Sequence, residues 1–124
     1  MTRAFAQRAW LLAIALQFGG CGPQIGDTCE RNSECGAGLK CDLASAGGYC
    51  TQTPCRAGEC PDGASCIDFG TETTWCMMDC VAAGDAAQCN AGHVCLTAAA
   101  SPTTKGAPRC LDGDCDFCGI APSD

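Results

Sequence analysis

Cysteine is the residue type in this sequence with the widest chemistry, because its sulfur can form a disulfide, ligate a metal, carry out redox reactions or accept a lipid. There are fifteen cysteines among 124 residues. The first, Cys21, directly follows an apolar segment, and the fourteen after it are an even number that can pair completely. The sequence therefore predicts a lipid on Cys21 and a disulfide framework made of Cys29, Cys35, Cys41, Cys50, Cys55, Cys60, Cys66, Cys76, Cys80, Cys89, Cys95, Cys110, Cys115 and Cys118.

Metal binding and redox catalysis are the alternatives to disulfides. Only Cys115 and Cys118 have the C-x2-C spacing, and His93 is the single histidine. A zinc site of this kind needs a second ligand pair, and a redox C-x-x-C needs a βαβ setting. We therefore expect disulfides, with no metal and no cofactor, and we expect His93 to be an exposed loop residue.

The acidic segment near the C-terminus offers the next candidate chemistry. Asp112, Asp114 and Asp116 alternate as at the start of a calcium loop, but the glycine and late glutamate of that motif are missing. We interpret residues 111–124 as a solvated acidic tail that carries the C-x-x-C pair. Neither a G-x-S-x-G elbow nor a phosphate-binding glycine loop is present, so we expect no catalytic residues and no enzyme.

Composition limits both the core and the partners. After residue 20 the chain has four aromatic and nine large aliphatic residues, too few for an ordinary core. Cross-links worth about 2–4 kcal/mol each must stabilise it. When Arg3 and Arg8 are left out, five basic and fourteen acidic residues remain, which gives a net charge of −9. Such a surface excludes nucleic acid as a partner and disfavours docking on anionic lipid by charge.

A repeat organises the cysteines. The pattern C-x2-G-x2-C occurs three times, each time with one cysteine upstream and one downstream, which divides the chain into units at residues 29–50, 55–76 and 80–110. Each central glycine should occupy a turn with positive φ. An aromatic residue precedes the last cysteine of the first two units. We expect short hairpin strands at Gly48–Thr51 and Thr73–Met78, a helical turn at Val81–Gln88, a loop at Ala98–Ala107 and a frayed end at Ile120–Asp124.

Residues 1–21 resemble a bacterial lipoprotein signal. Arg3 and Arg8 form a basic start, Ala9–Phe18 is an apolar run too short to span a bilayer, and Gly19 and Gly20 precede Cys21. The resemblance implies that residues 1–20 are removed and that residues 21–28 are a lipidated cysteine and its tether. Since Gly22 rather than Asp follows Cys21, it implies an anchor in the outer membrane or at the cell surface. The alternative is an ordinary secretory signal and a secreted protein.

Residues 27–110 resemble small Cys-rich modules of the EB and Dickkopf/colipase-like kind, as in the run from Asp27 through Cys29, Cys35 and Gly38 to Cys41. The fold class implied is small and disulfide-rich, with three tandem four-cysteine modules of short hairpins. The repeat predicts bridges within units, and with this resemblance it favours first-to-third and second-to-fourth pairing over the nested alternative. The pairs are Cys29–Cys41, Cys35–Cys50, Cys55–Cys66, Cys60–Cys76, Cys80–Cys95 and Cys89–Cys110, with Cys115–Cys118 left over.

Unit two carries the candidate contact residues, because its variable loop gathers large side chains favoured at interfaces: Phe69, Trp75, Met77 and Met78. The alternative is that Trp75 merely covers the disulfides. The whole sequence predicts a non-enzymatic, lipid-anchored envelope protein that binds, adheres or has a structural role through a protein or glycan partner. The alternative function is a secreted disulfide-rich inhibitor or toxin-like effector.

Overall fold

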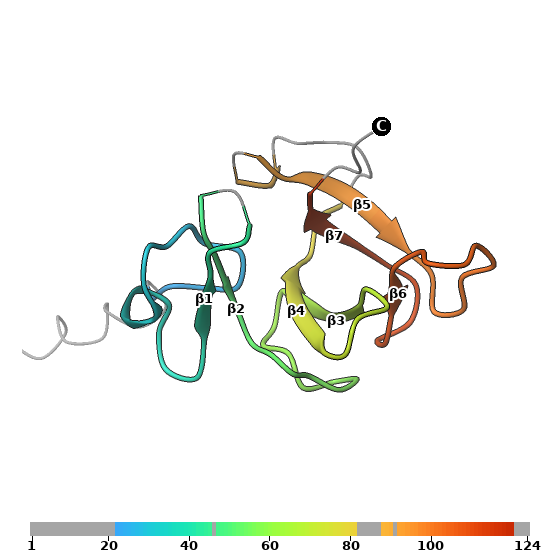
Figure 1. Cartoon of the computed structure of the whole chain (residues 1–124), viewed down its shortest axis with the longest axis horizontal. Helices are drawn as coiled ribbons and strands as arrows, with labels where there is room; N and C mark the ends of the chain where they lie inside the picture. The colour runs from blue at the N-terminus through green and yellow to red at the C-terminus, as the bar shows by residue number, and fades with distance from the viewer. Residues whose placement is uncertain (1–21, 46, 82–87, 91, 121–124) are drawn as a thin grey trace, which may run out of the picture.

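The computed structural model describes residues 22–45, 47–81, 88–90 and 92–120. They form a small disulfide-rich fold of short antiparallel strands and loops, as the sequence predicts, with seven disulfides (Figure 1). The named helical element is a single 3-10 turn. The elements are η1 (Asn32–Glu34), β1 (Lys40–Asp42), β2 (Tyr49–Thr51), β3 (Ala64–Asp68), β4 (Thr74–Met78), β5 (Val94–Ala98), β6 (Arg109–Cys110) and β7 (Cys115–Gly119).

Three hairpin-like pairs form the framework: β1 with β2, β3 with β4, and β5 with β7. Strand β6 adds to the outer edge of β3. The strands expected at residues 48–51 and 73–78 are confirmed as β2 and β4. In each pair two cysteines face each other across the strands: Cys41 with Cys50, Cys66 with Cys76, and Cys95 with Cys118.

The disulfides follow the interlaced pattern. Five of the predicted bridges are confirmed, and the nested alternative is wrong. In every unit the two cysteines that face each other across a strand pair bond to two cysteines earlier in the chain. The confirmed bridges are Cys29–Cys41, Cys35–Cys50, Cys55–Cys66, Cys60–Cys76 and Cys80–Cys95.

The last two predicted bridges are wrong. Cys89 bonds to Cys118 instead of Cys110, and Cys110 bonds to Cys115. The pairing rule still holds in unit three, but its fourth cysteine is Cys118, which lies opposite Cys95 in the sheet. Residues 99–114 are an insertion within this unit, and the Cys110–Cys115 bridge closes a local loop in it. Unit three therefore extends through β7, and residues 111–119 are not a separate tail.

The repeated glycines adopt the backbone conformation that the pattern predicts. Gly38, Gly63 and Gly92 have φ values of 81°, 88° and 87°. Residues with a Cβ are disfavoured in this left-handed region, whereas glycine is not. Each of these glycines lies shortly before the first strand of its hairpin, so the conserved conformation turns the chain into that strand.

The three units pack around one shared core. Tyr49 from unit one, Ile67 from unit two and Phe117 from unit three are each at most 2% exposed and lie in one cluster with several cystines. Tyr49, Trp75 and Phe117 all stand immediately before the fourth cysteine of their units, and Trp75 packs against the same cluster. The equivalent aromatic position of each repeat is thus directed toward a common centre.

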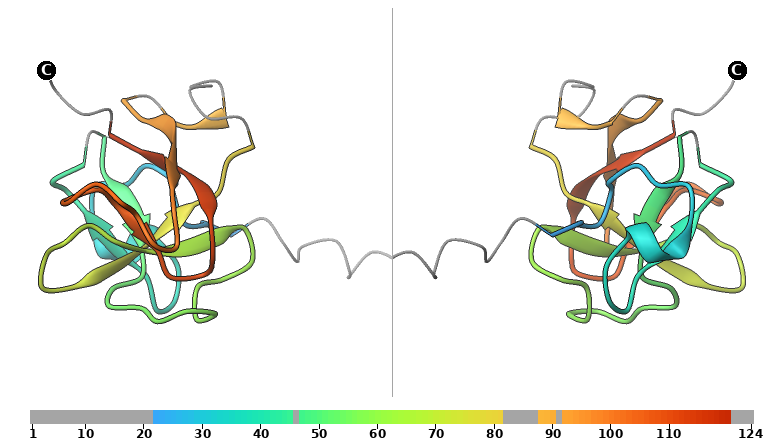
Figure 2. Two further views of the ribbon diagram at one scale, coloured as in Figure 1. Left: turned by 90° about the vertical axis from the view of Figure 1, so that its right-hand side faces the viewer. Right: turned by 90° about the vertical axis from the view of Figure 1, so that its left-hand side faces the viewer.

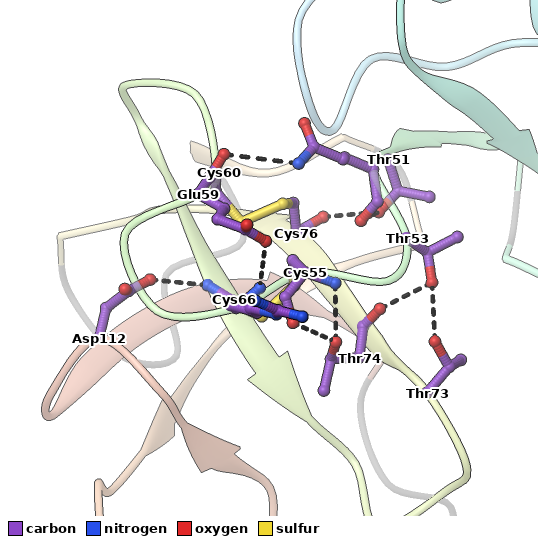
Figure 3. Close-up of a disulfide and its surroundings, with 12 residues drawn as sticks. Thr51, Thr53, Cys55, Glu59, Cys60, Cys66, Thr73, Thr74, Cys76 and Asp112 are labelled. Carbon is purple, nitrogen blue, oxygen red and sulfur yellow. Dashed lines mark hydrogen bonds between the residues drawn. A yellow bond between two sulfur atoms is a disulfide. The ribbon is translucent and has the colours of Figure 1, made fainter.

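The segment between units one and two is bonded along its length to β4 (Figure 3). The hydroxyl of Thr51 donates to the carbonyl of Cys76 at 2.8 Å, and that of Thr53 donates to the carbonyl of Thr74 at 2.7 Å. The Cys55 amide donates to the Thr74 hydroxyl at 2.8 Å. These bonds cover the outer edge of β4, so the first two units are joined by a fixed connection.

Most of the expected N-terminal tether is folded. Ile25 is 6% exposed, the Gly26 amide donates to the Cys50 carbonyl at 2.9 Å, and the Cys50 amide donates to the Asp27 carbonyl at 2.9 Å. The segment expected as a tether is therefore packed on the fold beyond Gln24, because the large apolar side chain of Ile25 lies in the core. The expected helical turn falls largely on residues 82–87, and the frayed end on residues 121–124, both outside the described residues.

Candidate apolar binding groove

An apolar groove of about 400 Å³ lies where the three units meet. It is bordered by the β1–β2 turn, by the end of the β3–β4 hairpin, and by β5 with the end of β7. Three of the four predicted contact residues line it, namely Phe69, Trp75 and Met77. The other lining residues are Asp42, Ala44, Ser45, Tyr49, Thr51, Thr71, Leu96, Gly119 and Ile120.

Strand β4 determines which predicted contact residues reach the groove. Side chains alternate between the two faces of a strand. Trp75 and Met77 share the groove face, whereas Met78 points to the other face and packs on Gly26. A Cβ at Gly26 would lie 2.7 Å from the Cβ of Met78, so only glycine fits there. Met78 is therefore a packing residue rather than a groove residue.

Tyr49 lies in the wall of the groove and is one of the lining residues that the sequence did not single out for this site. Its side chain is 2% exposed, and its hydroxyl accepts from the Met78 amide at 2.8 Å and donates to the Cys118 carbonyl at 3.2 Å. Desolvation by burial raises the pKa of Tyr49 to about 12, against a partly opposing hydrogen bond from Met78. The phenol is therefore neutral at physiological pH. Its two hydrogen bonds hold unit one against units two and three.

The polar rim of the groove is anionic. Asp42 is the single charged residue of the lining, which includes no lysine, arginine or histidine. Its carboxylate accepts from the Ala44 amide at 3.0 Å and from the Ser45 hydroxyl at 3.2 Å, so its position is fixed. The arrangement suits an apolar side chain inserted among Phe69 and Trp75, with a cationic neighbour near Asp42.

His93 does not occupy the exposed position expected for it. It is 3% exposed, and its ring lies 5.0 Å from that of Tyr49 at an interplanar angle of 44°. The corresponding residue of unit one is Leu39, which packs against the core as well. The expectation was wrong because this position, directly after the turn glycine, faces inward in both units, and the leucine was a signal of that burial.

The carboxylates of residues 112–116 lie at the surface and are hydrogen-bonded to neighbouring segments. Asp112 accepts from the amide of Cys66 at 2.9 Å (Figure 3) and from the amide of Gly58 at 2.6 Å, which joins the insertion to unit two. Asp114 accepts from the Ala100 amide at 2.8 Å, and Asp116 from the Thr97 hydroxyl at 3.0 Å. The acidic segment is exposed, as predicted, but it is not a separate tail, since each carboxylate holds a neighbouring strand or loop in place.

In the described part of the chain, three groups of cysteine sulfurs lie within 4.8 Å of one another, one in each unit. In every group two of the three sulfurs belong to one disulfide and the third to the adjacent, interlaced disulfide. Metal ligation by cysteine requires a thiolate, and these sulfurs are oxidised. The close grouping is therefore explained by the interlaced pairing. The groups are Cys29, Cys35 and Cys41; Cys55, Cys60 and Cys76; and Cys80, Cys89 and Cys118.

Comparisons of this chain with protein-family models, with curated proteins and with solved structures give no match. Within the described residues, no helix has the length and apolar character needed to cross a bilayer. Residues 1–21, where a signal segment and a lipidated Cys21 are expected, lie outside the described residues. Seven disulfides in so small a protein indicate an extracytoplasmic location, because cytosolic thiols are kept reduced.

Proposed function

We propose that this protein is a non-enzymatic binding protein, lipid-anchored through Cys21 at the outer membrane or cell surface, that takes an apolar peptide side chain into the groove. The observation that carries the binding role is the groove itself, where Phe69, Trp75 and Ile120 remain accessible although the chain has few large apolar residues. Apolar side chains left accessible in a concave site are characteristic of binding surfaces.

The anchoring part of the proposal is supported by the division of the cysteines. All fourteen cysteines after Cys21 are used in seven disulfides. Cys21 stands directly after the apolar segment and its two glycines, where a lipoprotein signal places its modified cysteine. It is therefore the cysteine that the disulfide framework leaves for another use.

The intact mass of the natively exported protein tests the anchor. We expect cleavage before Cys21, the added mass of acyl chains, and the loss of two hydrogens for each of the seven disulfides. Cys21→Ser should release the protein from membranes or block its processing. An exported chain that has lost its signal and carries no lipid would overturn the anchor and favour a secreted inhibitor or effector.

The groove's occupant is proposed to be a peptide segment with an aliphatic or aromatic side chain next to a lysine or arginine. The groove is apolar in its wall, and its one charged lining residue is acidic. The whole chain after residue 20 has a net charge of −9, which favours encounter with basic partners. A neutral glycan or a free fatty acid would gain no electrostatic attraction from this negative charge.

Fluorescence of Trp75 provides the binding test, because Trp10 in the signal segment is the other tryptophan. Short peptides with leucine or phenylalanine between lysines are titrated into the mature protein, with glutamate-flanked versions, an oligosaccharide and a fatty acid in parallel. We expect the lysine-flanked peptides to change the emission at the lowest concentration. Preferential binding of the fatty acid or the oligosaccharide would contradict the proposed occupant.

A pair of exposed aliphatic residues gives a matched control. Ile120 lines the groove and is 53% exposed, whereas Val81 is 83% exposed and is not among the lining residues. Ile120→Asp should weaken peptide binding about tenfold or more, which corresponds to about 1.4 kcal/mol. Val81→Asp adds the same charge and should leave binding unchanged. Equal effects of the two variants would exclude the groove as the binding site.

A further inference from the structure

The folded N-terminal segment lies on the opposite side of the β3–β4 hairpin from the groove. Gly26 packs against Met78, on the face of β4 that carries Cys76 and Met78. The groove is lined by Trp75 and Met77 from the other face of the same strand. Figure 2 shows the described chain beginning, in blue, at the side opposite to the turn between β3 and β4.

The segment is firmly attached on that side. Besides the backbone bonds between Gly26, Asp27 and Cys50, the side-chain amide of Asn90 donates to the carbonyl of Gly26. Unit three therefore holds the same segment as unit one. Ile25, at 6% exposure, is the first buried residue of the described chain, and Gly22, Pro23 and Gln24 before it are exposed.

The free length between Cys21 and the fold is short. Four Cα–Cα steps separate Cys21 from Ile25, a reach of about 14 Å when fully extended. A domain of this size has a diameter of about 30 Å. Because this reach is shorter than the diameter, the folded protein cannot invert relative to its anchor. The side that carries Gly26 must remain near the point of attachment.

We propose that the anchored protein holds its groove outward, away from its own bilayer, so that the occupant is a peptide of the aqueous phase and not an acyl chain of the membrane. This inference rests on the proposed lipid at Cys21. The outward orientation assigns the apolar groove to a peptide, because an apolar surface close to a bilayer would otherwise serve as a second membrane contact.

Tryptophan quenching tests the orientation with the acylated mature protein in vesicles of phosphatidylcholine and phosphatidylglycerol containing brominated phosphatidylcholine. Trp75 should be quenched by acrylamide and unaffected by the brominated lipid. The matched variant carries Gln24→Trp with Trp75→Phe, which moves the indole to the attachment side. Its emission should be strongly reduced by the brominated lipid.

The outcomes separate the orientation from the anchor. Flotation of the protein with the vesicles, measured in the same samples, reports the anchor alone, and failure to float would overturn the proposed lipidation. If the protein floats and brominated lipid quenches Trp75 as strongly as the introduced indole, or quenches neither, the orientation is wrong. Lysine-flanked peptides should also bind the vesicle-bound and released forms equally, and loss of binding on vesicles would contradict the outward groove.

Discussion

The hydroxyl of Tyr49 donates a hydrogen bond to the carbonyl oxygen of Cys118, 3.2 Å away, although 69 positions separate the two residues in the chain. The same hydroxyl accepts from the amide of Met78 in unit two. One side chain of unit one therefore joins the other two units, which share no disulfide with it or with each other. Tyr49 therefore links the units to one another, as the cystines link the segments within each unit.

Replacing Tyr49 tests this junction. Tyr49→Phe keeps the ring and removes the hydroxyl that bonds to the half-buried amide of Met78 and to the buried carbonyl of Cys118. We expect the free energy of unfolding to fall by about 1–3 kcal/mol, measured by denaturant titration with the disulfides intact. As a control, Thr97→Val removes the exposed hydrogen bond to Asp116 and should cost less than about 0.5 kcal/mol. Equal losses in both variants would refute the special role of Tyr49.

Alkaline pH should act on the same residue. Burial raises the pKa of Tyr49 from 10.0 to about 12, so the folded protein favours the neutral phenol while the unfolded chain ionises first. The stabilisation is present in full below pH 10 and is lost as the pH rises from 10 toward 12. Tyr49 is the single tyrosine, so tyrosinate absorbance reports it directly. A folded-state midpoint near that of the denatured chain, or an unchanged stability profile in Tyr49→Phe, would contradict this prediction.

Two glycines separate backbone strain from steric collision. Gly48 and Gly63 have φ values of +77° and +88°, so alanine at either position costs about 1–2 kcal/mol from the left-handed backbone. At Gly48 the new Cβ would also lie 1.9 Å from the carbonyl oxygen of Cys29, whereas at Gly63 nothing lies within 4 Å. Gly63→Ala should therefore fold with reduced stability, and Gly48→Ala should give little fully oxidised protein. Similar yields of the two variants would show that the packing beside Cys29 is loose.

Two of the three disulfides of unit three should differ in their contribution to stability. Cys89–Cys118 closes a separation of 29 residues and Cys110–Cys115 one of 5. Because a longer loop restricts the unfolded chain more, removing the first pair with alanine should destabilise the protein by about 1.5 kcal/mol more than removing the second. Each pair has one buried and one half-buried cysteine, so the alanine variants are well matched. Calorimetric midpoints compare them, and peptide mapping of the oxidised wild type should first recover both bridges.

The repeat predicted the framework well because it is local. The C-x2-G-x2-C pattern and the cysteine upstream of it fix the turn glycine and three of the four cysteines of each unit within a short stretch. It failed at the fourth cysteine of unit three, where an insertion separates Cys95 from Cys118. A signal was present in the sequence, since Phe117 precedes Cys118 as Tyr49 precedes Cys50, and this aromatic position identifies the fourth cysteine better than its spacing does.

The groove could be predicted only in part. Phe69, Trp75 and Met77 stood out because large side chains are rare in this chain, and the alternation along β4 then separates Met77 from Met78. The contributions of Tyr49 and Ile120 depend on how the units pack, which involves contacts between residues far apart in sequence. Local pattern cannot supply such contacts, and for the same reason His93 was misplaced.

The order in which the disulfides can form differs between unit three and the other two units. In a chain exported N-terminus first, units one and two receive their last cysteine, Cys50 or Cys76, soon after their others. Cys89 must wait until Cys118 has emerged, while Cys110 arrives earlier as a competing partner. All three units pair non-consecutive cysteines, so any bridge between neighbouring cysteines must be exchanged, and we expect this exchange to matter most in the last unit, where Cys110 competes for Cys89.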